Sequence, residues 1–167
     1  MAMVGLFWIA EGDVYVGAKP SGLADGVRLT TDGVLAFGEE QSGLLLWEDV
    51  RSLTVDDVPV KTLKRHVGAA VDMVLTLGLG GHDEAPLMTL RVGGPGGETE
   101  LTAYTAAAIG YSQREYDLSR ALLARLTEGA ATLHTTLAAM SEWGRRHEGG
   151  TPRTAEREAL LTEWVTG

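Results

Sequence analysis

The acidic residues of the segment GLLLWEDVRSLTVDD, residues 43–57, are the first candidates for chemistry. Two carboxylates can share a proton or hold a divalent cation only where their oxygen atoms converge in space. Asp56 and Asp57 are consecutive, and consecutive residues of a strand point to opposite faces of its sheet. Glu48 and Asp49 escape that alternation only in a turn, where carboxylates face water. We therefore expect all four acids to be exposed and predict no catalytic residue here.

The histidines do not have a spacing that is typical of a metal site. They are His66, His82, His134 and His147. In the run GHDE, His82 precedes two acids, but three consecutive side chains seldom point the same way. The chain contains no cysteine, which excludes disulfides, thiolate zinc sites and a cysteine nucleophile. We predict neither a metal nor a cofactor.

The glycine-rich runs GLGG and GGPGG do not have the context of a phosphate-binding loop. Such a loop lies between a strand and the N-terminus of a helix, whereas these runs separate two strand-like patterns. Ser42 lacks the G-x-S-x-G frame of a nucleophile elbow. We interpret the glycine runs as hairpin connections and find no motif for nucleophilic catalysis.

A basic cluster in VKTLKRH is the remaining candidate for ligand binding, formed by Lys61, Lys64 and Arg65. Phosphate groups prefer charge-assisted hydrogen-bond donors, so this loop could bind an anionic headgroup. The alternative is a solvated loop that pairs with surface acids. The net charge of −9 opposes binding to nucleic acid and to anionic membranes.

The elements that must position these residues change in type along the chain. Up to about residue 105, apolar residues alternate with polar ones between glycine-containing turns, which is typical of an antiparallel sheet. Glu11-Gly12-Asp13 and Asp32-Gly33 predict hairpins, the latter with a type I′ turn. Further strands are expected at 71–77, 88–92 and 99–104. Leu44 and Leu46 are expected to face the interior, together with Val50, Leu53 and Val55.

Helices are predicted after this sheet. Ser112 and Glu115 have the spacing of a capping box, so a helix is expected over 112–128 with Gly129 as its stop. A second helix is expected over about 130–147. A third follows Pro152, capped by Thr151 or Thr154. Its apolar face either folds back onto the body or binds another chain. This face consists of Leu160, Leu161, Trp164 and Val165.

The run GVRLTTDGVLAFGEEQSGLLLWEDVRSL, residues 26–53, resembles bacterial pleckstrin-homology-like (PH-like) and GRAM-like domains. Their pattern is strand, turn, strand, then hydrophobic-Trp-x-Asp-Val-x-x-hydrophobic, and the predicted helix at 112–128 stands where their capping helix lies. The resemblance covers about residues 13–128. It implies a bent antiparallel barrel capped by a C-terminal helix, a fold that hosts lipid binding, peptide binding and scaffolding alike.

Together these observations predict an α+β, mainly β fold: a PH-like barrel or meander of about seven to nine strands over 1–128 and a helical extension over 129–167. The apolar start of the chain stops at Glu11 and predicts neither a signal peptide nor an anchor, and the residue bias is typical of a high-GC genome. We expect a cytoplasmic, non-catalytic module that binds a protein partner, or itself as a homodimer, through the helical tail or a sheet edge. The alternatives are an anionic headgroup-binding domain and an enzyme of unrecognised type.

Overall fold

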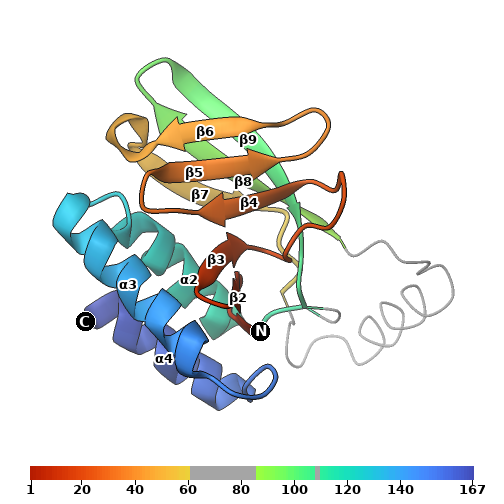
Figure 1. Ribbon diagram of the computed structural model, residues 1–167, viewed down its shortest axis with the longest axis vertical. Helices are drawn as coiled ribbons and strands as arrows, with labels where there is room; N and C mark the ends of the chain where they lie inside the picture. Colours follow the sequence, from red (N-terminus) through yellow and green to blue (C-terminus); the bar gives the residue numbers. More distant parts are fainter. Residues whose placement is uncertain (61–85, 108–109) are drawn as a thin grey trace, which may run out of the picture.

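The computed structural model describes residues 1–60, 86–107 and 110–167, which form antiparallel sheets followed by three helices (Figure 1). The chain is therefore α+β, as predicted. The strand expected at 71–77, the basic loop at 61–65, His66 and His82 lie outside the described residues.

The first sheet has six antiparallel strands in chain order. They are β1 (Ala2–Val4), β2 (Phe7–Ala10), β3 (Asp13–Val16), β4 (Gly26–Leu29), β5 (Gly33–Phe37) and β6 (Gly43–Leu46). The β2–β3 hairpin is confirmed: Glu11 and Gly12 both have positive φ, 53° and 93°, as a two-residue type I′ turn requires. The hairpin at Asp32-Gly33 is also confirmed, but its predicted type I′ turn is wrong, because neither Asp32 nor Gly33 has a positive φ. There the Thr30 hydroxyl accepts the N–H groups of Asp32 and Gly33 and shapes the turn.

The second sheet has the order β7 (Ser52–Asp56), β8 (Leu87–Gly94), β9 (Gly97–Tyr104). The predicted turn at GGPGGE joins β8 to β9. A single turn of 3₁₀ helix, η1 (Trp47–Asp49), links β6 of the first sheet to β7 of the second and redirects the chain at Glu48 and Asp49. The described strands thus form two separate sheets and no closed barrel.

Gln41, in the connection between β5 and β6, joins the two sheets. Its side-chain Nε2 donates to the Thr102 carbonyl oxygen at 2.8 Å, and its Oε1 accepts the Thr102 N–H at 2.8 Å. The same Nε2 also reaches the carbonyl oxygen of Phe37 at 3.1 Å. One side chain therefore pairs with β9 as a strand residue would, and it holds the β5–β6 connection against the second sheet.

The three helices are α2 (Gln113–Arg125), α3 (Ala130–Arg146) and α4 (Thr154–Thr166). The predicted capping box is confirmed, because the Ser112 hydroxyl accepts the Glu115 N–H and the Glu115 carboxylate accepts the Ser112 N–H. Gly129 caps α3 instead of ending α2. The predicted cap of α4 is wrong: its N-cap is Arg153. Thr151 and Thr154 instead accept hydrogen bonds from the Met3 N–H and from Arg157.

The helices gather on one side of the molecule, beside β2 and β3 and away from β5 and β6 (Figure 1). α3 lies against β2 and β3, and α4 lies against α2 and β1. Both late helices contribute to the same hydrophobic core as the strands. Their core residues are Leu133, Leu137, Met140, Leu161 and Trp164. The boundary predicted at residue 128 therefore falls inside one continuous core. Among the described helices, none is long and apolar enough to cross a membrane.

Candidate functional site

The apolar face of the last helix, for which the sequence left both packing onto the body and binding of another chain open, is largely covered by the chain itself. Leu161 is completely buried and Trp164 is 5% exposed, while Leu160 and Val165 are half-buried. The Trp164 ring meets Trp143 of α3 edge to face, with 5.9 Å between ring centroids. Of these two alternatives, the structure shows packing onto the body, because α4 lies against α2, α3 and β1. Partner binding through Leu160, Leu161, Trp164 and Val165 would need this face to be released.

A buried ion pair holds α4 in this position. Arg157 Nε lies 2.5 Å from Glu115 Oε1, and its Nη2 lies 3.1 Å from Glu115 Oε2. Arg157 Nη1 also donates to the Pro152 carbonyl oxygen at 2.6 Å. Burial acts to raise the pKa of Glu115, but the hydrogen bonds from Arg157 and Ser112 bring that pKa below its ordinary value. The pair joins the N-terminus of α2 to α4, so we assign it a structural role.

Tyr111 precedes Glu115 of this ion pair by four residues, and its side chain is also buried. Its hydroxyl accepts the Ala106 N–H at 3.1 Å, and burial raises the pKa of Tyr111 to about 12. The neutral phenol therefore persists across the physiological pH range. The sequence marked Glu115 through its capping box, but no local signal marked Tyr111 or Arg157 as its neighbours.

The acids of the 43–57 segment are exposed, as expected, although one geometric argument was wrong. Glu48 and Asp49 lie in η1 and face solvent. Asp56 pairs with Arg91, and Asp57 accepts a hydrogen bond from Thr89 at 3.2 Å. Thr89 and Arg91 lie two apart on β8, so both carboxylates reach the same face. Strand alternation does not apply, because β7 ends at Asp56 and Asp57 turns with a φ of 62°.

Of the two described histidines, His134 lies in the second turn of α3 and His147 is the C-cap residue of that helix, so they are far apart. His134 is exposed, and His147 stacks on Trp143 with ring centroids 4.4 Å apart. In residues 1–60, 86–107 and 110–167, no group of three or more histidines and acids could hold a metal ion. The basic residues Lys61, Lys64 and Arg65 lie outside this part of the chain.

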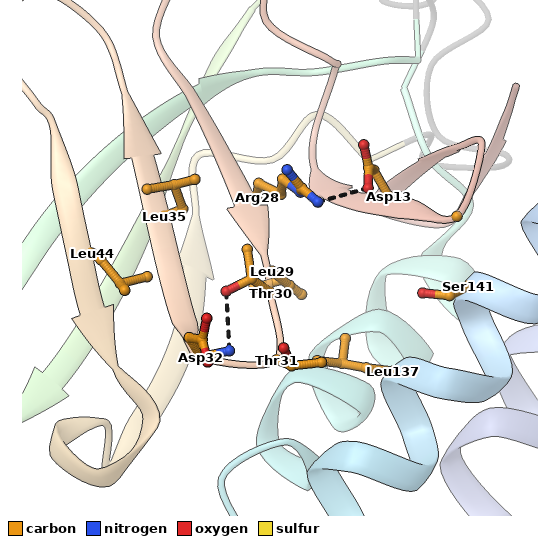
Figure 2. A pocket seen from close by; sticks show the side chains of 11 residues that line it. Asp13, Arg28, Leu29, Thr30, Thr31, Asp32, Leu35, Leu44, Leu137 and Ser141 are labelled. Atoms are coloured by element: carbon orange, nitrogen blue, oxygen red, sulfur yellow. Dashed lines mark hydrogen bonds and ion pairs between the residues drawn. The ribbon is translucent and has the colours of Figure 1, made fainter.

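A groove of about 380 Å³ lies between β4–β6 and α3 (Figure 2). Leu35 and Leu44 stand on neighbouring strands at one side of it, and Leu137 and Ser141 come from α3 at the other. Arg28 and Asp13 point toward each other at its far end, with 2.7 Å between Arg28 Nη2 and Asp13 Oδ1. The groove therefore has a mixed lining, in which leucines from both sides alternate with threonine, aspartate and serine side chains and with one half-exposed ion pair.

Strand register explains why the groove continues onto an exposed apolar surface. Arg28 pairs with Leu35, and Leu35 pairs with Leu44, so one row of side chains crosses three strands on one face. Leu46 lies two residues beyond Leu44 and shares that face. We call the surface formed by Arg28, Leu35, Leu44 and Leu46 the outer face. Leu44 is 44% exposed and Leu46 is 40% exposed.

The prediction that Leu44 and Leu46 face the interior is wrong. Leu45 packs against the core and pairs with the fully buried Val34, so its two neighbours turn outward. Three consecutive leucines make both faces of this strand apolar, and the sequence does not show which set is covered. Val50, Leu53 and Val55 are buried as expected.

The backbone around the groove is held by specific hydrogen bonds. Trp47 Nε1 donates to the Thr30 carbonyl oxygen at 2.7 Å, which ties the end of β6 to the β4–β5 turn. The described lining residues include two carboxylates and the Ser141 hydroxyl, but no histidine or lysine that could serve as its base. The arrangement suits binding better than nucleophilic catalysis.

A second hollow of about 350 Å³ lies between residues 18–25 and the end of β9. Lys19, Asp25 and Thr105 line it. Asp25 already accepts a hydrogen bond from the Thr102 hydroxyl, and the buried Thr105 hydroxyl has no partner within the described residues. Its one carboxylate is engaged elsewhere, so we base no function on it.

Comparison with known proteins adds no relative from which a function could be transferred. No family model matches the chain, no curated protein matches it, and no solved structure matches its fold. We therefore argue function from the outer face and its groove.

Proposed function

We propose that this chain is a non-catalytic, cytoplasmic module that binds a protein partner through the outer face of β4–β6. The observation that carries the proposal is the exposure of Leu44 and Leu46 on a strand that borders a 380 Å³ groove. Single exposed leucines are ordinary. Two neighbouring exposed leucines that adjoin a groove of mixed lining, through Leu35 opposite Leu44, favour an interaction surface.

The position of the helices supports the same surface. α3 and α4 cover β1–β3, and the apolar residues of these two helices pack into the core. The helical tail therefore offers little apolar area, whereas β6 keeps two leucines in water. Burying a leucine completely contributes about 1.5–3 kcal/mol, so covering what remains exposed of these two contributes roughly 1 kcal/mol each.

We also propose that the fold is a variant of the PH-like arrangement. A strand–turn–strand unit over β4–β6, the corner at Trp47–Asp49 and a capped helix at Gln113–Arg125 support this interpretation. An experimentally determined structure of the whole chain tests it. A whole-chain structure that shares the strand order and helix position of PH-like domains supports it, and a different strand order or helix position contradicts it.

The binding proposal is tested by capture of partners from native lysate with three forms of the full chain. These are the wild type, the double variant L44T/L46T and the control L87T. Leu87 is 47% exposed on β8 of the other sheet, so the control removes an equally exposed leucine elsewhere. Threonine keeps the β-propensity of each position.

We expect the wild type and L87T to capture the same partner and L44T/L46T to lose it. Circular dichroism and the urea midpoint of each variant serve as folding controls. Equal capture by all three forms places binding away from the outer face and contradicts the proposal.

A further inference from the structure

We propose that the partner of the outer face is an extended polypeptide segment that adds to β6 as a further strand, with alternating apolar residues and basic residues at both of its ends. This inference rests on the proposed function and names the chemistry of its ligand.

The register of β6 leaves backbone groups directed toward such a segment. The Trp47 N–H donates to the Asp32 carbonyl oxygen at 3.2 Å, which makes Asp32 and Trp47 a hydrogen-bonded pair. Hydrogen-bonded and non-hydrogen-bonded pairs alternate along an antiparallel ladder, so Val34 and Leu45 also form a hydrogen-bonded pair. Leu44 and Leu46 fall between these pairs. Their N–H and C=O groups therefore point away from β5, to the side where β6 ends the described sheet.

β6 lacks the residues that usually protect a sheet edge. Natural edge strands are blocked by lysine, by proline or by an inward-pointing charge. The strand Gly43–Leu46 reads GLLL and contains none of these. Strand addition uses such an edge for backbone hydrogen bonds and uses the neighbouring side chains for specificity. The residues of an added strand that lie opposite Leu44 and Leu46 share the outer face, so apolar side chains two positions apart fit there.

Acidic residues flank the edge on both sides. Glu39 and Glu40 precede β6, Glu48 and Asp49 follow it, and all four are exposed. A segment that carries lysine or arginine beyond each end of its apolar core would place these cations against the two acidic pairs. Such complementarity speeds encounter and sets register more than it adds affinity.

The same charges argue against a second copy of this chain as the occupant. Antiparallel pairing of β6 with β6 of another copy would bring Glu39 and Glu40 of one copy against Glu48 and Asp49 of the other. Like charges placed opposite each other are unfavourable, and each copy carries a net charge of −9. A basic partner would neutralise these acids, whereas a second copy would place acidic residues against acidic residues at both ends of the paired strands.

Binding of defined peptides to the full chain, followed by fluorescence anisotropy, tests the inference. The probe has three valines alternating with two threonines, with two lysines at each end. One comparison peptide carries glutamates at both ends, and another replaces the central valine with proline, which removes a backbone donor. We expect the lysine-flanked peptide to bind at least tenfold more tightly than either, which corresponds to about 1.4 kcal/mol.

Two variants of the protein complete the test. In E39K/E40K/E48K/D49K, the preference between the lysine- and glutamate-flanked peptides should reverse. In L44T/L46T, the lysine-flanked peptide should bind at least fivefold more weakly than it does to L87T. Equal affinity for the proline peptide means that charge alone attracts the probe, and this overturns the inference.

The inference is also overturned if the lysine-flanked peptide does not bind at millimolar concentration, or if light scattering shows a dimer that L44T/L46T dissociates. If lysate capture still depends on Leu44 and Leu46 in these cases, the proposed function stands and only the inferred ligand fails. If capture does not depend on them, the proposed function fails as well.

Discussion

Replacing Arg157 with methionine should destabilise the whole domain, although Arg157 is far from the outer face. Methionine has a similar length and keeps apolar contacts, so R157M removes mainly the charge and its hydrogen bonds. The Glu115 side chain is 1% exposed and the Arg157 side chain is 11% exposed. The substitution therefore leaves a buried carboxylate without its counter-ion.

The expected loss follows from the contacts. Removing one partner of a buried ion pair costs about 3–5 kcal/mol, because the remaining charge stays desolvated. R157M also removes the donor to the Pro152 carbonyl oxygen. Domains of ordinary stability unfold at a cost of about 5–15 kcal/mol, so the expected loss in R157M is between about a fifth and the whole of that free energy of unfolding. The double variant E115Q/R157M removes the uncompensated charge and should recover about 1–2 kcal/mol relative to R157M.

Urea unfolding followed by tryptophan fluorescence measures this effect, since Trp164 of α4 lies against Trp143. The matched control is R153M, which replaces an exposed arginine at the N-cap of the same helix and should change the free energy of unfolding by less than about 0.5 kcal/mol. If R157M unfolds within about 1 kcal/mol of the wild type, α4 is weakly docked. The assignment of its apolar face to the core would then be refuted, and a tail that releases to bind a partner would regain support.

The same region gives two further predictions. The pKa of Glu115 is lowered in the folded state, so its ion pair contributes fully above the ordinary value of 4.5 and is lost as pH falls through the lowered pKa. The free energy of unfolding should therefore fall below about pH 4.5 less steeply in E115Q than in the wild type; equal slopes in urea titrations would contradict this. L161A should lower the free energy of unfolding by about 2–5 kcal/mol, and the half-buried control L160A by clearly less. Similar losses would mean that Leu161 is not a core residue.

Local signals predicted most of the elements correctly. The capping box at Ser112 and Glu115, the two-residue turn at Glu11-Gly12 and the glycine run after β8 each involve residues within a few positions of one another. The hydrogen bonds and backbone angles that define these features involve only neighbouring residues, so they can be predicted without knowing the rest of the fold.

The side-chain pairs that join distant parts of the chain could not be predicted from local signals. Glu115 and Arg157 are 42 positions apart, and Gln41 reaches Thr102 across 61 positions. Each of these side chains is polar and would by itself be expected at the surface. Only the packing of α4 onto α2, and of one sheet against the other, makes them buried partners.

The outer face shows most clearly why the candidate site escaped the sequence. In the run Leu44-Leu45-Leu46 both strand faces are equally apolar, so the alternation that normally marks the buried face is absent. Pairing with β5 determines which leucine is buried, because Val34 faces the core and pairs with Leu45. Exposure of the other two leucines then follows from the helices, which cover β1–β3 and stop short of β6. A strand that is apolar on both sides but covered on one is unusual in a chain that is otherwise well patterned. Within residues 1–60, 86–107 and 110–167 no strand pairs with the free edge of β6, and the proposed partner would account for the sequence GLLL at that edge.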